Sequence, residues 1–301
     1  MYEGATARKL PRSARFVDLS DYARPLAVRI ARRLENTNVV APDVTVVWGI
    51  IGLIAAFCYG AGGYRMALFG AVALQAKNVL DAVDGSLARL QARPSRVGRF
   101  LDSIGDAAVA AAVAVGLAVA IGRDRPWAYA AGLAAVGLVL GLLQGSVYNY
   151  YYVRYRARRG GDVTSRVKEE LTVYDRVHYE DRPFALELLR SLIYAYNLIY
   201  GWQDTLVHKL DAWAVRPLTS IDRMEEADAL RDNRRLLTVV SALGPGLQIL
   251  ILSLFTVAGY WNLTLMLELY LWTLGLGGSL YAIAIVLWLR GASSRQVRTP
   301  R

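Results

Sequence analysis

The sequence is poor in cysteine, histidine and charge. Cys58 is the only cysteine among 301 residues, so no disulfide can form within the chain and a disulfide-rich secreted scaffold is excluded. The two histidines, His178 and His208, are too few for a zinc site, and we expect both on a solvated surface. Charged residues make up 20% of the chain and hydrophobic residues 55%, which excludes a disordered protein.

The charges that are present are mostly positive. Lysine and arginine number 35 against 25 aspartates and glutamates, which gives a formal net charge of +10. A basic chain can bind nucleic acid, anionic lipid or phosphate. The positions of the charges must decide among these partners.

Long apolar runs dominate the chain. A membrane-spanning helix needs about 20 mostly apolar residues. No apolar run near Met1 follows a short basic region, so we expect no cleavable signal peptide. We predict an all-α, polytopic membrane protein with six transmembrane helices, at about 43–63, 64–90, 97–122, 127–153, 236–259 and 263–289.

The basic residues predict the orientation. With the N-terminus inside, the external loops hold only Arg65, Arg123 and Arg125, and nearly all other basic residues face the cytoplasm. Most of the positive charge is therefore a topology signal, and we expect no nucleic-acid partner. The prediction is a multi-pass protein of the cell membrane, surrounded by membrane lipids.

The remaining segments organise around these spans. Residues 1–41 form a cytoplasmic N-terminus, in which Leu26, Ile30 and Leu34 share one face of an amphipathic helix over about 21–36. An interfacial helix is favoured, with a soluble helix packed on the insertion as the alternative. A cytoplasmic helical insertion is predicted at 154–235, either packed on the membrane or bundle or forming a solvated hairpin. It separates spans one to four, within 42–153, from spans five and six, within 236–290, and a cytoplasmic tail follows at 291–301.

Four aspartates interrupt the apolar pattern. Asp81 and Asp84 are three residues apart, and Asp102 and Asp106 are four apart, so each pair projects from one helix face. The short loop between the two helices brings all four carboxylates to one depth, just inside the cytoplasmic leaflet. Arg89 is the only nearby basic residue that we expect to offset them.

Clustered carboxylates cannot all remain ionised without cations. A site for divalent metal is the simplest solution, and oxygen-only ligands suit Mg²⁺, Mn²⁺ or Ca²⁺. We predict two metal ions, with Mg²⁺ preferred and Mn²⁺ as the alternative. Paired metals stabilise the attacking and leaving oxygens in displacements at phosphorus.

These residues resemble a known family. The pattern D-x2-D-G-x2-A-R-x8-G-x3-D-x3-D resembles that of the CDP-alcohol phosphotransferases. The start of the first span, Ala41-Pro42-Asp43-Val44-Thr45, resembles the family's P-N-x-x-T, with Asp43 in place of the usual asparagine. The motif positions are Asp81, Asp84, Gly85, Ala88, Arg89, Gly98, Asp102 and Asp106.

The resemblance implies a reaction and a set of roles. An alcohol would attack the phosphorus distal to cytidine in a CDP-linked donor, and CMP would leave. Asp106 would be the general base and also a possible metal contact. The metal ligands would be Asp81, Asp84, Asp102 and Asp106, and the nucleotide and pyrophosphate site would be lined by Thr45, Gly85, Ala88 and Arg89.

The acceptor is less well defined by the sequence. The preferred hypothesis is phosphatidyl transfer from CDP-diacylglycerol to a polar alcohol. The alternatives are transfer from CDP-choline or CDP-ethanolamine to diacylglycerol, and a transporter that binds a cation. The candidate acceptor-binding residues are Asn78, Tyr148, Arg154 and Arg156.

Three features elsewhere carry weaker predictions. Gly137, Gly141 and Gly145 form a stripe of small residues that permits close helix contact within the bundle or between protomers. The family resemblance favours a homodimer. We expect a break in the fifth span at Gly244-Pro245-Gly246, and a local pairing or a wet crevice for Glu268.

Overall fold

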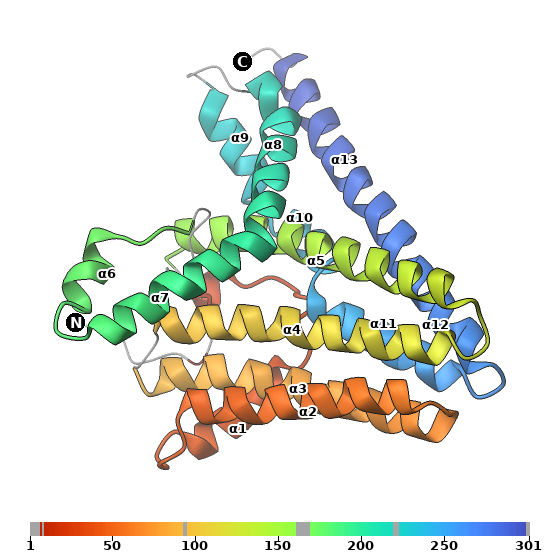
Figure 1. The fold of residues 1–301 in the computed structure, drawn as a ribbon. Coiled ribbons are helices and arrows are strands. Elements are labelled where there is room, and N and C mark those ends of the chain that lie inside the picture. The colour runs from red at the N-terminus through yellow and green to blue at the C-terminus, as the bar shows by residue number, and fades with distance from the viewer. Residues whose placement is uncertain (1–6, 8, 93–94, 161–168, 219–222, 299–301) are drawn as a thin grey trace.

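The computed structural model describes residues 7, 9–92, 95–160, 169–218 and 223–298, and every regular element in these ranges is helical. Figure 1 shows the order and arrangement of the elements. The predicted all-α class is therefore confirmed. The elements are η1 (Arg12–Ala14), α1 (Arg24–Leu34), α2 (Ala41–Ala61), α3 (Tyr64–Leu90), α4 (Arg96–Ile121), α5 (Trp127–Arg158), α6 (Val173–His178), α7 (Pro183–Tyr196), η2 (Asn197–Gly201), α8 (Trp202–Val215), η3 (Arg216–Leu218), α9 (Met224–Arg231), α10 (Arg234–Ser241), α11 (Pro245–Ala258), α12 (Leu263–Trp272), η5 (Thr273–Gly277) and α13 (Gly278–Arg298).

The bundle contains the helices expected of an integral membrane protein. Within the described ranges, α2, α3, α4, α5 and the continuous unit 263–297 are each long and apolar enough to cross a bilayer. The pair α10 and α11 reaches that length only as one span bent by 41°. The structure thus has five or six candidate spans, and the count of six stays a prediction.

The bend between α10 and α11 lies at the predicted glycine-proline break. Pro245 begins α11, where its missing N–H leaves no helical hydrogen bond unmade. Ser20 packs into the bend, and its Oγ accepts a hydrogen bond of 2.9 Å from the Gly246 backbone N–H. A Cβ on Gly246 would lie 2.0 Å from the Ser20 carbonyl oxygen. The glycine is therefore required for this close approach.

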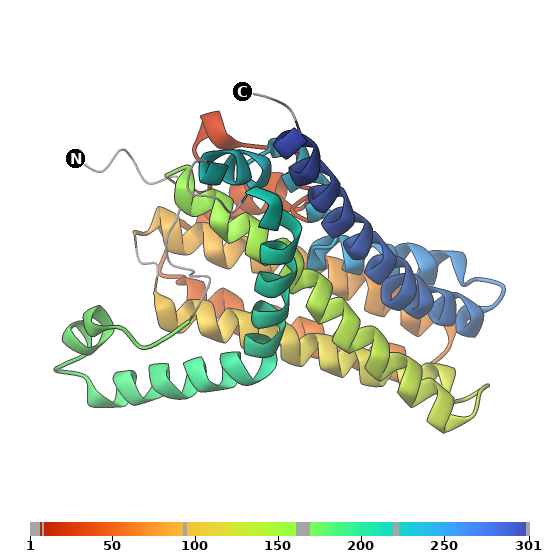
Figure 2. The ribbon, with the colours of Figure 1, turned by 90° about the horizontal axis from the view of Figure 1, so that it is seen from above.

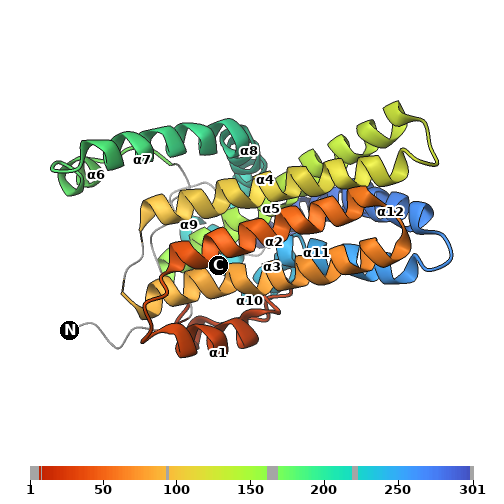
Figure 3. The same ribbon diagram turned by 60° about the horizontal axis from the view of Figure 1, so that its bottom comes forward.

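The helix α2 packs against both α3 and α4 (Figure 3). Trp48 and Tyr59 from α2 are at most 1% exposed, and Leu117 of α4 packs in the same cluster. The Tyr59 hydroxyl lies 2.9 Å from Thr256 Oγ1 and so ties α2 to α11. Rigid packing here fixes the ends of α3 and α4, which carry the aspartates.

The helix α1 forms where the amphipathic pattern predicts a helix, and its buried face includes the predicted Ile30 and Leu34 together with two alanines. Ala27 and Ala31 are fully buried and pack against Val83 and Leu87 of α3. Leu26, expected on the apolar face, is 49% exposed. The small alanines permit close packing on α3, so α1 belongs to the bundle and not to the insertion; an interfacial position stays a prediction.

The segment between α5 and α10 is helical and packs in part on the bundle. α7 lies along α4, where Leu189 and Tyr196 surround the fully buried Phe100 (Figure 2). Other apolar residues of the predicted helical pattern remain exposed, including Phe184 at 82%. Arg96 and Arg99 at the start of α4 both pair with the buried Glu169. A solvated hairpin is therefore wrong for α7, which docks on α4.

The stripe of small residues on α5 faces the chain's own helices. A Cβ on Gly137 would lie 2.8 Å from Leu271, and one on Gly141 would lie 3.2 Å from Leu274. These two glycines therefore serve close contact within the bundle. Glu268 pairs with Arg125 through two hydrogen bonds of 2.7 and 3.0 Å, which confirms the local pairing.

Candidate metal and substrate site

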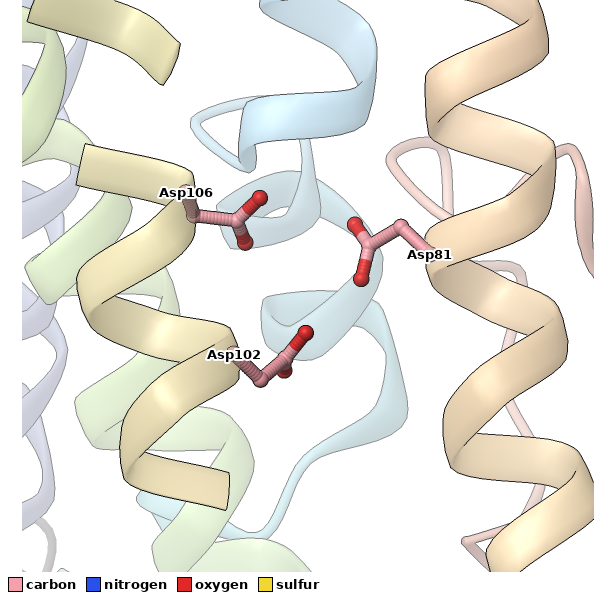
Figure 4. A group of neighbouring side chains, drawn as sticks. All are labelled: Asp81, Asp102 and Asp106. Carbon is pink, nitrogen blue, oxygen red and sulfur yellow. The ribbon is translucent and has the colours of Figure 1, made fainter. Parts of the chain in front are cut away.

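Three aspartates converge between α3 and α4. Asp81 extends from α3, and Asp102 and Asp106 extend from α4 toward the same point (Figure 4). Each can offer one carboxylate oxygen such that the three oxygens lie within 4.8 Å of one another. The predicted spacing on two facing helices therefore does bring these side chains together.

Asp84, the fourth predicted metal ligand, lies outside this group. Its side chain is 5% exposed, and its Oδ2 accepts hydrogen bonds from Trp48 Nε1 at 2.7 Å and from Thr45 Oγ1 at 2.9 Å. Thr45, predicted at the nucleotide site, thus contacts the carboxylate of a motif residue. Both donors come from α2, so this helix holds Asp84 in place.

Lys77, a polar residue near the site in the sequence, pairs with the aspartates inside the acidic group, which their spacing alone does not predict. Lys77 is 3% exposed, and its Nζ lies 3.3 Å from Asp81 Oδ2 and also pairs with Asp106. The same ammonium lies 4.4 Å from the centre of the Trp48 ring. The expectation that only Arg89 lies near enough to offset the aspartates is wrong. The spacing of four residues between Lys77 and Asp81 on one helix was the available signal.

The residues of the group fit a divalent cation. All donors are carboxylate oxygens, which are typical ligands of Mg²⁺, Mn²⁺ and Ca²⁺. Oδ1 of Asp102 is buried and has no hydrogen-bond partner among the described residues. A buried carboxylate oxygen without a partner is costly unless a cation satisfies it. Asp81, Asp102 and Asp106 could hold such an ion.

Of the remaining motif residues, Gly85, Ala88 and Arg89 lie on α3 and Gly98 lies in the first turn of α4. Gly85 lines the cavity beside the aspartates, whereas Thr45, Ala88 and Arg89 are not among the described residues that line it. Arg89 Nη2 donates a hydrogen bond of 3.2 Å to the carbonyl oxygen of Ala7. Asp43 accepts a hydrogen bond from the Val40 N–H and so caps the start of α2.

A cavity of about 400 Å³ begins at the aspartates and extends between the spans. The carboxylates of Asp81, Asp102 and Asp106 line its polar part. Its opposite wall is apolar and comes from α4, α5, α11 and α12. That wall includes Val113, Leu117, Leu138, Leu252, Leu271 and Leu274.

The four predicted acceptor-binding residues divide between the cavity and its surroundings. Asn78, Tyr148 and Arg156 line the cavity, and the Tyr148 hydroxyl donates a hydrogen bond of 2.6 Å to Asp18. Arg154 instead pairs with Asp228 at 2.6 Å and is not among the described lining residues. Arg156 is 2% exposed. Of the two predicted arginines, Arg156 therefore lines the cavity and Arg154 does not.

The segment before α1 adds a further cation to the cavity. Lys9 lines it, although the sequence analysis singled out no residue before Asp21. Burial lowers the pKa of Lys9 to about 8, and repulsion from Arg156 and Arg24 acts in the same direction. No periodic pattern marks Lys9, because residues 9–11 belong to no regular element.

The fold and the site define an integral membrane protein with an acidic, metal-competent site at the polar end of a cavity within its bundle. The comparison with known families gives the particular family. The model of the CDP-alcohol phosphatidyltransferase family matches residues 39–199, just over half of the chain. The chain belongs to this family, whose members are metal-dependent transferases.

A curated relative is a protein of Thermococcus kodakarensis named bifunctional IPC transferase and DIPP synthase. The two sequences are 35% identical over 121 residues, which is 39% of this chain. The match covers 27% of the length of that relative, so it concerns one part of a longer protein.

Proposed function

We propose that this protein transfers the phosphatidyl group of CDP-diacylglycerol to a polar alcohol and releases CMP. The observation that carries the proposal is the cavity, because it joins the acidic group to an apolar wall among the spans. An amphiphilic donor needs both surfaces: the carboxylate end for its pyrophosphate, through bound cations, and the apolar wall for its acyl chains. The relative's name, a transferase and synthase, supports the same reaction class.

The proposed reaction is a displacement at phosphorus. The alcohol oxygen forms a bond to the phosphorus distal to cytidine, the bond from that phosphorus to the CMP oxygen breaks, and CMP takes the electron pair. We assign Asp106 as the base that accepts the alcohol proton. Asp81, Asp102 and Asp106 would hold divalent metal, two Mg²⁺ ions in our proposal, which would stabilise charge on the phosphate oxygens when bound.

The other chain residues have supporting roles in this proposal. Lys77 fixes Asp81 and Asp106 relative to each other, and Trp48 and Thr45 hold Asp84 at the edge of the site. Asp84 would complete the metal ligands, and Gly85, Ala88 and Arg89 would border the nucleotide. We also propose a homodimer, which the family resemblance favours. The active site would lie at the cytoplasmic leaflet of the cell membrane, which the distribution of basic residues favours.

A direct assay tests the reaction. Purified protein in lipid nanodiscs is given labelled CDP-diacylglycerol, Mg²⁺ or Mn²⁺ and a panel of alcohols, and mass spectrometry follows CMP and the lipid product. We expect CMP only when a suitable alcohol is present. Release of CMP from CDP-choline or CDP-ethanolamine with diacylglycerol would favour the alternative transferase. Cation uptake into vesicles without any CMP would favour a transporter.

A pair of variants tests the assigned base. We expect Asp106→Asn to abolish turnover while donor binding persists, because the amide cannot accept the alcohol proton. Asp43→Asn is the matched control, since Asp43 caps α2 and an asparagine can also accept the Val40 hydrogen bond. Unchanged turnover in Asp106→Asn would remove Asp106 from the role of base.

A further inference from the structure

The surface of α8 divides into three rows of side chains. One row is buried and consists of Gln203, Val207, Asp211 and Ala214. A second row is exposed and mostly polar, and it consists of Thr205, His208, Lys209 and Ala212. The third row is exposed and apolar, with side chains between 37% and 49% exposed, and it consists of Trp202, Leu206, Leu210 and Trp213. We call this third row the apolar row of α8.

The apolar row is continuous along the helix. Its members are spaced by four, four and three residues, so they share one helix face. Leu198, four residues before Trp202, is 70% exposed and extends the row into η2. Single apolar side chains on a surface are ordinary, but a continuous row with a tryptophan near each end indicates an interaction surface.

The start of α8 lies level with the acidic group. The Ser146 hydroxyl of α5 donates a hydrogen bond of 3.0 Å to Gln203 Oε1. The Tyr200 hydroxyl, two residues before α8, donates one of 3.1 Å to the carbonyl oxygen of Ser103. Ser103 directly follows Asp102 on α4, so the first turn of α8 is held at the depth of the aspartates.

The end of α8 is fixed at the polar end of the last candidate span. Arg290 of α13 donates a hydrogen bond of 2.8 Å to the carbonyl oxygen of Trp213, and its guanidinium lies 5.0 Å from the centre of the Trp213 ring. The Ser293 hydroxyl donates one of 2.7 Å to the carbonyl oxygen of Ala214. Arg290 is the first charged residue after the apolar run that ends at Leu289. The end of α8 therefore lies where the apolar part of α13 gives way to charge.

The helix α8 thus runs across the spans and not along them. It rises about 12 Å from Gln203 to Asp211, whereas their hydrogen-bond partners on α5, Ser146 and Tyr150, are only about 6 Å apart along that helix. Figures 1 and 2 show α8 crossing the direction of α4. A helix that crosses the bundle at this level lies in the plane of the membrane surface.

We infer that α8 is an interfacial helix and that its apolar row lies among the lipids at the membrane surface, at the end of the bundle that carries the acidic group. Tryptophan favours the boundary between acyl chains and headgroups, and a helix with separate apolar and polar rows binds there. The row is also continuous with a lipid-facing surface, because Leu287 and Trp288 of α13 are exposed within one turn of Arg290. The insertion is therefore held by the bilayer as well as by the bundle.

Spin labelling tests the position of the row. Cys58, the only cysteine, is buried in α2, so the unaltered protein serves as the labelling blank. A nitroxide is attached to Leu206→Cys or Leu210→Cys in full-length protein in lipid nanodiscs. The matched controls are Thr205→Cys and Ala212→Cys on the exposed polar row of the same helix. Collisions are measured with oxygen, which concentrates in the bilayer, and with a nickel chelate, which stays in water.

The labels on the apolar row should collide severalfold more with oxygen and severalfold less with the nickel chelate than the labels on the polar row. Equal nickel accessibility at all four positions would place the row in water and overturn the inference. Spin–spin broadening at Leu206→Cys and Leu210→Cys that disappears on dilution with unlabelled protein would show that a second copy of the chain covers the row. That result would also overturn the inference.

Tryptophan fluorescence supplies a second measurement without cysteines. Lipids brominated near the headgroup quench tryptophans that lie at the membrane surface. The double variant Trp202→Phe/Trp213→Phe should lower the intensity that these lipids quench, whereas Trp48→Phe, which removes a buried tryptophan of α2, should leave it unchanged. Equal quenched intensity in the double variant and the unaltered protein would contradict a position among lipids.

The inference does not depend on the proposed transfer reaction. A solvated apolar row would overturn the interfacial position of α8 and leave the CMP assay unaffected. Absence of CMP from every donor and acceptor would contradict the proposed function, and the labelling pattern would still establish how α8 lies in the membrane.

Discussion

Replacement of the buried lysine in the acidic group should make the protein dependent on metal for its stability. Lys77 pairs with Asp81 and Asp106, whose side chains are 26% and 32% exposed. Removal of one partner of a buried ion pair costs about 3–5 kcal/mol, and the partial exposure of the aspartates favours the lower figure. We therefore expect Lys77→Met to lose about 3 kcal/mol without metal, or roughly 6–12 °C in Tm.

A divalent cation should reverse this loss, because it supplies the positive charge that the lysine provided. The measurement is the Tm of purified protein in detergent, first with a chelator and then with saturating Mg²⁺. The rise in Tm on adding Mg²⁺ should be several degrees larger in Lys77→Met than in the unaltered protein. Lys209→Met is the matched control, since that lysine is exposed on α8.

Equal Mg²⁺-dependent shifts in the variant and the unaltered protein would refute the reasoning. That result would mean that the cation does not bind among Asp81, Asp102 and Asp106, or that Lys77 contributes no charge compensation. A loss of Tm that Mg²⁺ leaves in place would point to packing of the lysine stem against Trp48 instead.

Two further predictions concern packing and pH. Gly116→Ala should destabilise the protein by about 1–3 kcal/mol, because its Cβ would lie 2.4 Å from the Ala56 carbonyl oxygen. Gly132→Ala is the control, since a Cβ there meets nothing within 4 Å. Equal Tm values for the two variants would contradict the close contact. Burial raises the pKa of Asp204 from 3.8 to about 6. Between these two pH values the folded state binds more protons than the unfolded state, so the Tm should fall as the pH rises from about 4 to 6. Asp204→Asn should flatten that decline in thermal melts, and an unchanged pH profile would argue against the buried carboxylate.

The aspartate spacing predicted most of the acidic site, because helical periodicity is local. Residues three or four apart must share a helix face, and a short loop must bring α3 and α4 together, so Asp81, Asp102 and Asp106 could be assigned to one group. The position of Asp84 could not be predicted in the same way. It depends on Trp48 and Thr45, which come from another helix and are placed by packing.

The long apolar runs likewise predicted the bundle, since about 20 apolar residues have few alternatives to a membrane-spanning helix. The buried face of α1 was predicted in part, because Ile30 and Leu34 pack in the cluster between α1 and α3 as their spacing indicates. The alanines at its centre were not predicted. The small side chains of Ala27 and Ala31 permit close contact with α3, and Leu26 remains exposed. Lys9 lies outside any periodic pattern, so only the three-dimensional arrangement reveals it.

The contacts of the segment before α1 set the order in which the protein can mature. Ser20 is held by Gly246, and Leu19 by Ser241, more than 220 positions later in the chain. Leu19 and Ser20 must therefore wait for α10 and α11 to be synthesised and inserted before they reach their final place. The aspartates of α3 and α4 can assemble early, but the segment that carries Lys9 is anchored only after α10 and α11 are in place. A chain that ends before α10 should therefore leave this wall of the cavity without its anchoring contacts.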